Sequence, residues 1–386
     1  MTPATIQWEE GGAARRARWQ SEAGLPPPKR VTVVEAITAD KAFPLASEGT
    51  ALLWRGDYHQ AKQLLVALAK RIDERAHRGK VKPAENTDPA QAFHLHRQAQ
   101  AQRARTLGMV LLPVDAGHVV PLPRAPDLKL ACTEAYGAAR EPYVVTLREL
   151  LGVIGAHEWR KKGVPVPALG ASVHPHYGVF APVRGEYVDL VATAPLPPVV
   201  ATAPADATAF DIGTGTGVLA AVLARRGIGR VVATELDARV LACAADNARR
   251  LGLADRIELV NADLYPLGKA PLIVCNPPWL PARPSSALER AVYDEGGRML
   301  KGFLSGLAAR LTAQGEGWLI LSDLAEHLGL RSRAALLGEF AAAGLIVLDR
   351  IDARPSHPRA CDSTDALHAA RAAEVTSLWR LARAST

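Results

Sequence analysis

Short β-rich runs alternate with amphipathic segments through the second half of the chain. The β-rich runs predict seven strands, at Thr208–Ile212, Arg230–Glu235, Arg256–Asn261, Pro271–Cys275, Glu316–Ser322, Leu345–Ile351 and Thr376–Leu381. Apolar residues at three- and four-residue spacing between these runs predict helices at Val218–Arg226, Ala238–Leu251, Leu288–Leu311 and Ser332–Ala343. This alternation is typical of a doubly wound α/β sheet, in which the last two strands form an antiparallel edge hairpin.

The first half of the chain has a weaker pattern. Helical spacing predicts helices at His59–His77, Gln91–Leu107 and Leu147–Lys162. A hairpin is expected over Met109–Val120, interrupted by Asp115, Ala116 and Gly117. These elements predict a mainly helical α+β N-terminal domain.

Changes in composition suggest where the parts of the chain meet. Three consecutive prolines, Pro26 to Pro28, and an Arg-rich stretch predict that the first segment is poorly ordered. A Pro- and Ala-rich, nearly uncharged stretch around residue 200 predicts a linker. The expected parts are a flexible segment 1–45, a substrate-recognition domain 46–164, a segment 165–204 that holds a substrate-pocket hairpin and the linker, and an α/β domain 205–386.

The net charge of +7 belongs to the front of the chain, where residues 1–170 hold 24 Lys and Arg against 17 Asp and Glu. This excess suggests an acidic partner such as RNA, although a diffuse solubilising charge would explain it equally well. The four cysteines form no C-x-x-C pair, which argues against a zinc site and a disulfide framework. Without a signal peptide or an apolar span of membrane length, we expect a soluble, cytoplasmic monomer.

A glycine-rich run, Asp211 to Gly217, follows the first predicted strand of the α/β domain. Its G-x-G-x-G spacing lets backbone N–H groups approach a ligand. The dinucleotide fingerprint G-x-G-x-x-G would place its third glycine at position 218, which is Val218 in this chain, and this disfavours NAD. Glu235 ends the next strand, where a carboxylate accepts ribose hydroxyls. The expected nucleoside contacts are Asp211, Gly213, Thr214, Gly215, Gly217, Glu235, Leu236, Ala262 and Asp263, the last bonding an adenine amino group.

The run from Asn276 to Trp279, with sequence N-P-P-W, carries the chemistry of the chain. Pro277 and Pro278 lack N–H groups and fix the backbone after a buried strand, so nearby carbonyl oxygens stay available. The Asn276 amide oxygen adds an acceptor, and Trp279 offers a flat face for a planar group. Two acceptors on an NH2 group would expose the nitrogen lone pair and stabilise the charge that develops on transfer.

These motifs together resemble the class I S-adenosylmethionine-dependent methyltransferases with an N/D-P-P-Y/F/W motif. Residues 235–253 and the run D-E-G-G-R-M-L-K-G-F-L after N-P-P-W further resemble the release-factor glutamine methyltransferases and the small-domain RNA guanine methyltransferases. The resemblance implies a Rossmann-like seven-stranded sheet, S-adenosyl-L-methionine as cofactor, and Asn276 at both the cofactor and the reacting nitrogen. It implies a macromolecular acceptor, a protein such as a translation factor or an RNA.

In these families a short hairpin before the glycine-rich loop shapes the substrate pocket. His176–Tyr187 occupies that place, so the implied substrate contacts are Tyr177, Phe180, Pro182, Arg184 and Trp279. Two features depart from the family pattern. A tryptophan replaces the usual tyrosine of the glutamine enzymes, and Pro195, Pro197 and Pro198 interrupt the helix that usually precedes the first strand.

Other interpretations stay open. The N-P-P-W run would hold a flipped adenine of DNA or RNA equally well, and a non-catalytic cofactor- or RNA-binding module is a third possibility, which intact Asn276 argues against. The pairs His94-x-His96 and His174-x-His176 lack neighbouring ligands, so we expect no metal site. Cys275 is interpreted as a small buried strand residue rather than a nucleophile.

Overall fold

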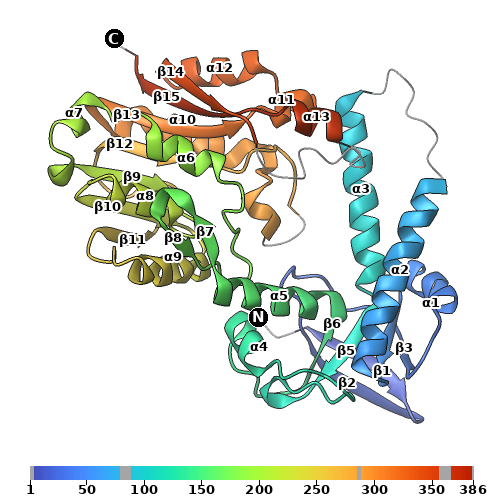
Figure 1. The fold of residues 1–386 in the computed structure, drawn as a ribbon. Helices are drawn as coiled ribbons and strands as arrows, with labels where there is room; N and C mark the ends of the chain where they lie inside the picture. The colour runs from blue at the N-terminus through green and yellow to red at the C-terminus, as the bar shows by residue number, and fades with distance from the viewer. Residues whose placement is uncertain (1–3, 79–87, 285–287, 356–366, 385–386) are drawn as a thin grey trace. The chain divides into compact units, whose positions relative to one another are not determined.

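The computed structural model describes residues 4–78, 88–284, 288–355 and 367–384. The chain forms two compact units, Met1–Glu158 and Trp159–Thr386. Each unit has its own sheet and its own helices (Figure 1). The second unit carries the predicted chemistry.

The second unit is built on a seven-stranded sheet. Its strands are β9 (Thr208–Ile212), β10 (Arg230–Glu235), β11 (Ile257–Asn261), β12 (Ala270–Cys275), β13 (Leu311–Ser322), β14 (Leu345–Ala353) and β15 (Thr376–Arg383). The strand order is β11-β10-β9-β12-β13-β15-β14, and β15 alone runs in the direction opposite to the other six strands. All seven predicted strands and the antiparallel edge are confirmed.

Alternate residues along the strands face two different cores, as the pleat of a sheet requires. In β12, Leu272 and Val274 face helices α6 (Glu186–Thr193) and α8 (Val218–Arg225), whereas Ile273 faces helices α10 (Arg298–Arg310) and α12 (Arg333–Ala342). Helix α9 (Ala238–Arg250) packs on the α8 side of the sheet. The sheet is therefore covered on both faces, which explains the nearly continuous apolar runs of its strands.

The predicted helix Leu288–Leu311 is wrong in its first half. The chain makes two short 3₁₀ turns, Leu288–Ala291 and Glu295–Gly297, and α10 starts only at Arg298. Gly296 and Gly297 adopt φ of 68° and 70°, a left-handed conformation that an α-helix cannot contain.

The segment before β9 is part of the fold and not a free linker. A hairpin of β7 (Val164–Val166) and β8 (Ala171–Val173) precedes helix α6, and a short helix α7 (Pro198–Ala201) follows α6. Val200 is fully buried in the core beside α8, so apolar packing holds the Pro- and Ala-rich stretch in place. The hairpin lies upstream of the expected His176–Tyr187, whose residues form a loop and the start of α6.

The first unit contains a six-stranded mixed sheet in addition to its helices. The strands are β1 (Thr5–Glu10), β2 (Ala13–Trp19), β3 (Arg30–Val34), β4 (Thr50–Trp54), β5 (Val110–Val114) and β6 (Tyr143–Thr146), in the order β1-β2-β6-β5-β4-β3. This corrects the expectation that residues 1–45 are poorly ordered. Ile6 and Trp19 are buried in the core of this sheet, and that burial orders the segment.

The helices of the first unit largely follow the predicted positions. Helices α2 (Tyr58–Arg78) and α3 (Pro89–Leu107) lie side by side (Figure 1), with α1 (Ala39–Ser47), α4 (Lys129–Tyr136) and α5 (Leu147–Lys162) completing the set. The hairpin predicted over Met109–Val120 is wrong. Strand β5 pairs with β4 and β6 instead, and a single bridge between Asp115 and Val119 closes the turn.

Candidate active site

The strand register brings the predicted site residues to one edge of the sheet. Ile212, at the end of β9, pairs with Thr234 of β10 on one side and with Cys275 of β12 on the other. Gly213, Glu235 and Asn276 therefore lie at the same edge of the sheet, because Glu235 is the last residue of β10 and the other two directly follow β9 and β12. This is the carboxyl edge of a parallel sheet, where α/β folds bind their ligands.

The glycine-rich loop adopts a conformation that favours glycine. Gly213, Gly215 and Gly217 have φ of 71°, 58° and 81°. A side chain at Gly217 would meet Ala244 of α9 at 3.4 Å, whereas the corresponding position at Gly215 is open. The loop thus packs against α9 at its end and leaves space beside its middle glycine.

Asp211, near the end of β9, holds this loop in place through hydrogen bonds. Its carboxylate is 1% exposed and accepts hydrogen bonds from the Thr214 hydroxyl at 2.6 Å and the Ala220 N–H at 3.0 Å. These bonds join the strand, the loop and the first turn of α8. Burial raises the pKa of Asp211 to about 6, although both hydrogen bonds oppose the rise.

Glu235 is the last residue of β10, as the sequence predicts. Its Oε1 accepts the N–H of Leu236 at 2.9 Å, and the Gly215 N–H also donates to the carboxylate. Burial raises the pKa of Glu235 despite these bonds. Leu236 beside it is 59% exposed, an apolar surface next to a partly buried carboxylate.

Asp263 lies beyond the end of β11 and is exposed. Its carboxylate forms an ion pair with Arg298, the first residue of α10. Strand β11 is the edge strand of the sheet and lies next to β10. Asp263 therefore lies on the side of Glu235 that is away from Asn276. The N–H of Ala262 donates a hydrogen bond to the Glu235 carbonyl at 3.2 Å, which joins the ends of β11 and β10.

The N-P-P-W run begins directly after β12. The indole Nε1–H of Trp279 donates a hydrogen bond to Asn276 Oδ1 at 2.8 Å, so the two side chains form one unit. Cys275 before them is fully buried, and burial raises the pKa of its thiol well above the usual range. A thiol of this kind is a strand residue and not a nucleophile.

The four other predicted substrate residues lie in the loop between β8 and α6. Phe180 is 37% exposed, Pro182 is buried and Tyr177 is half-buried. The guanidinium of Arg184 lies over the Trp279 ring, 4.9 Å from its centroid. Arg184 and Trp279 are thus in direct contact, which sequence spacing alone could not indicate.

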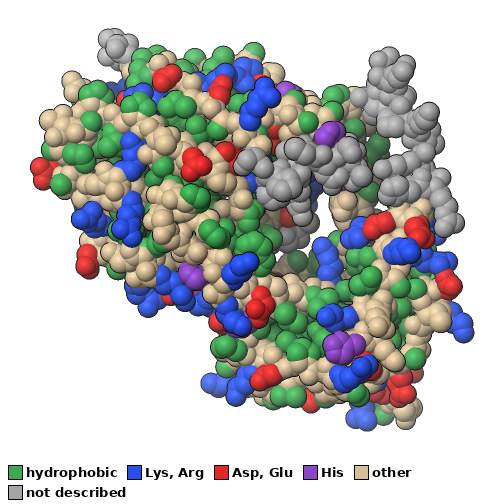
Figure 2. Space-filling view, in the orientation of Figure 1, with side chains coloured by type: hydrophobic (Ala, Val, Ile, Leu, Met, Phe, Trp, Pro, Cys, Tyr) green, Lys and Arg blue, Asp and Glu red, His purple; other side chains and the backbone are tan. Residues whose placement is uncertain are grey.

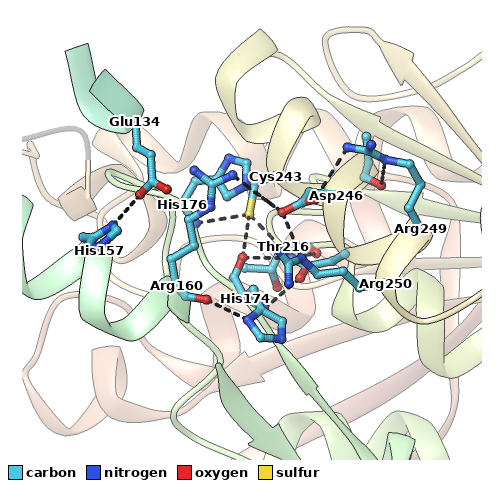
Figure 3. A network of polar contacts seen from close by, with 12 residues as sticks. Glu134, His157, Arg160, His174, His176, Thr216, Cys243, Asp246, Arg249 and Arg250 are labelled. Carbon is cyan, nitrogen blue, oxygen red and sulfur yellow. Dashed lines mark hydrogen bonds and ion pairs between the residues drawn. The ribbon is translucent and has the colours of Figure 1, made fainter. Parts of the chain in front are cut away.

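The His174-x-His176 pair fastens this loop to α9 (Figure 3). His176 Nε2 lies 3.3 Å from Asp246 Oδ2, and His174 Nδ1 contacts the Arg160 carbonyl at 2.7 Å. The buried Asn247 amide accepts the His174 N–H at 2.7 Å and donates to the Thr216 carbonyl at 3.0 Å. The described residues contain no group of three or more His, Cys, Asp or Glu that could hold a metal ion.

Sequence reasoning missed several polar residues around the site. They are Asn247, Asp294, Glu186, Ser322 and Glu374, all of them buried. Asp294 accepts the N–H groups of Met299 and Leu300 and thereby caps α10. A signal existed for this residue, since an acidic side chain before two glycines and an apolar run is typical of a helix start.

Comparison with known proteins identifies the segment that carries these residues. A family model described as the methyltransferase small domain matches residues 171–324. This segment is similar to the methyltransferase small-domain family. The match includes the glycine-rich loop, Glu235 and the N-P-P-W run, and it confirms the predicted family for this part of the chain.

Curated relatives match parts of the chain at moderate identity. The ribosomal protein L11 methyltransferase of Pelotomaculum thermopropionicum is 45% identical over 71 residues, 18% of this chain and 23% of the relative. The release factor glutamine methyltransferases of Cereibacter sphaeroides and Moorella thermoacetica are 42% identical over 85 residues and 40% over 106, spanning 21% and 26% of this chain and 31% and 38% of the relatives. The chain thus covers less than two-fifths of the length of each of these relatives.

Solved structures also align with the chain. The ribosomal protein L11 methylase of Lactobacillus delbrueckii subsp. bulgaricus aligns with a TM-score of 0.36 and 17% identity, covering 54% of this chain and 82% of that one. The fold of the second unit is established by its own strand order and register. Among the described residues, no helix is both long and apolar enough to cross a membrane.

Proposed function

We propose that this protein is an S-adenosylmethionine-dependent N-methyltransferase that acts on a planar NH2 nitrogen, with a glutamine amide of a translation-machinery protein as its acceptor. One observation carries the proposal. Asn276 follows β12 directly beside the glycine-rich loop that follows β9, so an acceptor for N–H groups stands next to a nucleoside-binding loop. A fold that only binds a nucleoside has no use for this neighbour.

The residues of the carboxyl edge fit S-adenosylmethionine. The space at Gly215 leaves room for a ligand against the loop, and Glu235 stands beside that glycine. Glu235 would accept the ribose hydroxyls, exposed Leu236 would cover one face of the adenine, and Asp263 would accept its amino group. Asp211 would act through the loop that it holds.

S-adenosylmethionine supplies an electrophilic methyl group on its sulfonium. The protein's part is to hold the acceptor nitrogen and shape its electronics. An amide nitrogen delocalises its lone pair, and carbonyl acceptors on its two N–H bonds favour the geometry in which that lone pair is free. Asn276 Oδ1 supplies one acceptor, and the backbone of the Pro277-Pro278 turn, without N–H groups, leaves its carbonyl oxygens for the other.

These acceptors also stabilise the positive charge that develops on nitrogen, because they are already oriented before the reaction. No general base is needed, since the methylated nitrogen is acidic enough to lose its extra proton to solvent. The reaction thus depends on orientation more than on proton transfer.

The names of the relatives support the proposed acceptor. Two of them are named for the glutamine of release factors, and another for ribosomal protein L11. These names support a protein of the translation machinery as acceptor. A guanine or adenine amino group presents the same planar NH2 and is the alternative that the test must separate.

The first unit is proposed to select the acceptor. Basic and acidic side chains are interspersed over the face shown in Figure 2. Arg103 and Arg124 form ion pairs with Asp73 at 2.8 Å and Asp57 at 2.6 Å. This partial neutralisation favours a protein surface over a phosphate backbone, which needs many cations to be available together.

The test is methyl transfer from labelled S-adenosylmethionine to three acceptors: purified release factors, ribosomal protein L11 and total RNA. Mass spectrometry then locates the methyl group. We expect it on a glutamine amide of a release factor. A methyl label found only on guanine or adenine would show that the acceptor is a nucleobase and not a glutamine. Cofactor binding without any transfer would indicate a non-catalytic module.

A further inference from the structure

A buried ion cluster lies against the N-P-P-W run. Arg184 donates from Nε to Glu186 Oε1 at 2.6 Å and from Nη1 to Glu374 Oε1 at 3.0 Å. The Ser322 hydroxyl donates to the same Glu374 oxygen, and Thr376 Oγ1 lies 3.5 Å from Arg184 Nη2. The cluster thus joins the start of α6, the end of β13 and the start of β15.

The two carboxylates hold the guanidinium in a fixed plane. The side chains of Glu186 and Glu374 are 5% and 3% exposed, and that of Arg184 is 21% exposed. A buried carboxylate requires a partner, and a planar guanidinium that donates to two of them from different edges cannot rotate without losing one bond. Arg184 is therefore occupied by the protein and not free to bind an anionic group of a substrate.

The guanidinium is stacked on the reacting motif. It lies 4.9 Å from the centroid of the Trp279 ring, within the range of a cation–π contact. The same indole donates its N–H to Asn276 Oδ1 at 2.8 Å. A continuous chain of contacts thus runs from the buried carboxylates through Arg184 and Trp279 to the Asn276 amide.

We propose that Arg184 is a positioning residue for methyl transfer, held by Glu186 and Glu374, and that it acts through Trp279 to orient the Asn276 amide. This inference rests on the proposed function and gives the buried ion cluster a role in it. The ring face that Arg184 covers is closed to the acceptor, which must use the opposite face of Trp279. An arginine that touched the acceptor would instead determine how tightly the acceptor binds.

The decisive variant is Arg184→Lys, because it keeps a buried positive charge between the carboxylates but loses the planar fork and the stacking. With a release factor as acceptor, we expect kcat to fall about 10-fold or more while KM for the acceptor and the cofactor Kd stay within about twofold, since misplacing a positioned group lowers the rate of the chemical step. A raised KM with unchanged kcat would overturn the inference and make Arg184 a substrate contact.

A second readout does not depend on activity. In protein labelled with 5-fluorotryptophan, the 19F resonance of Trp279, identified through Trp279→Phe, should shift in Arg184→Lys. Arg226→Lys is the matched control, because Arg226 lies 5.6 Å from the Trp318 ring and donates to the Val191 and Ala194 carbonyls. It should shift the Trp318 resonance and leave kcat unchanged.

The double variant Arg184→Gln with Glu374→Gln covers the case in which the lysine variant does not fold, because it removes one charge of each sign. It should lower kcat and shift the Trp279 resonance as well. An unshifted Trp279 resonance in a folded variant overturns the inference, whatever the activity. A wild-type protein that transfers no methyl group to any acceptor contradicts the proposed function, and the resonance then still decides whether Arg184 positions Trp279.

Discussion

Trp279 donates its indole N–H to Asn276 Oδ1 at 2.8 Å. This bond determines which end of the Asn276 amide is oxygen, because only an acceptor can face the indole N–H. A carbonyl oxygen has two lone pairs, so Oδ1 can accept this bond and still accept one from an acceptor NH2 group. The residue that departs from the usual tyrosine therefore gives this site its own means of fixing the amide.

Trp279→Phe keeps a flat ring and loses this N–H. We expect kcat to fall about 2- to 12-fold, the equivalent of one ordinary hydrogen bond of about 0.5–1.5 kcal/mol, with cofactor affinity unchanged. Steady-state kinetics of methyl transfer measure it. Trp318→Phe is the control, because Trp318 donates to Glu316 within the same sheet and should affect stability but not kcat. Equal effects of the two variants on kcat would contradict the role of the bond.

Glu235→Ala should weaken S-adenosylmethionine binding by about 1–3 kcal/mol, the typical loss for a charge-assisted hydrogen bond. Titration calorimetry on the full-length protein measures this change. Glu258→Ala is the matched control, since Glu258 is an exposed carboxylate on neighbouring β11 that pairs with Arg230. If Glu235→Ala binds the cofactor as tightly as the control does, the ribose assignment is wrong.

Asp211 should make stability depend on pH in a specific direction. Its folded pKa of about 6 lies above the ordinary value of 3.8, so between these values the folded state holds a proton that the unfolded chain has released. The cost of burying this carboxylate is therefore fully present above pH 6 and disappears as the pH falls towards 4. At about 1.4 kcal/mol per pKa unit, it amounts to at most about 3 kcal/mol.

Asp211→Asn tests this contribution, because the amide oxygen can replace the Oδ2 that accepts from Thr214 and Ala220. Urea unfolding of both proteins should give a variant that is more stable than the wild type at pH 7 and equally stable near pH 4. A difference in the free energy of unfolding that does not change with pH would show that Asp211 does not titrate in this range.

The first unit should govern acceptor binding and leave cofactor binding alone. Reversing two helix cations together, Lys62→Glu with Arg97→Glu, should raise KM for the acceptor, and the effect should diminish at high salt because charges at a surface are screened. Kinetics at two salt concentrations measure it. The control reverses two exposed cations of the second unit, Lys269 and Arg383. An equal rise in both proteins would mean that only net charge matters.

The sheet of the second unit could be predicted from the sequence because its strands are short apolar runs separated by strong helix and turn signals. The glycine-rich loop, Glu235 and Asn276 could be placed for the same reason, since a parallel sheet gathers strand ends at one edge. The first unit was harder. Strand β2 has the sequence A-A-R-R-A-R-W and buries only its last residue, so periodicity could not distinguish it from a loop.

The polar cluster behind Trp279 could not be predicted, for a different reason. Arg184, Ser322 and Glu374 come from distant parts of the chain, and each alone has the character of a surface residue. Only the antiparallel insertion of β15 beside β13 brings Thr376 opposite Ser322 and places Glu374 next to it. Tertiary pairing, and not local pattern, creates this part of the site.

Single-turnover methyl transfer by Asn276→Ala tests the role of Asn276 directly, with Asn276→Asp as the variant that keeps an acceptor. The alanine variant should lose about 10²–10³ in rate, the usual loss for one preorganised transition-state contact, while the cofactor Kd stays within about twofold. The aspartate variant should retain more activity than the alanine variant. Transfer by Asn276→Ala at the wild-type rate would show that Asn276 does not hold the acceptor nitrogen.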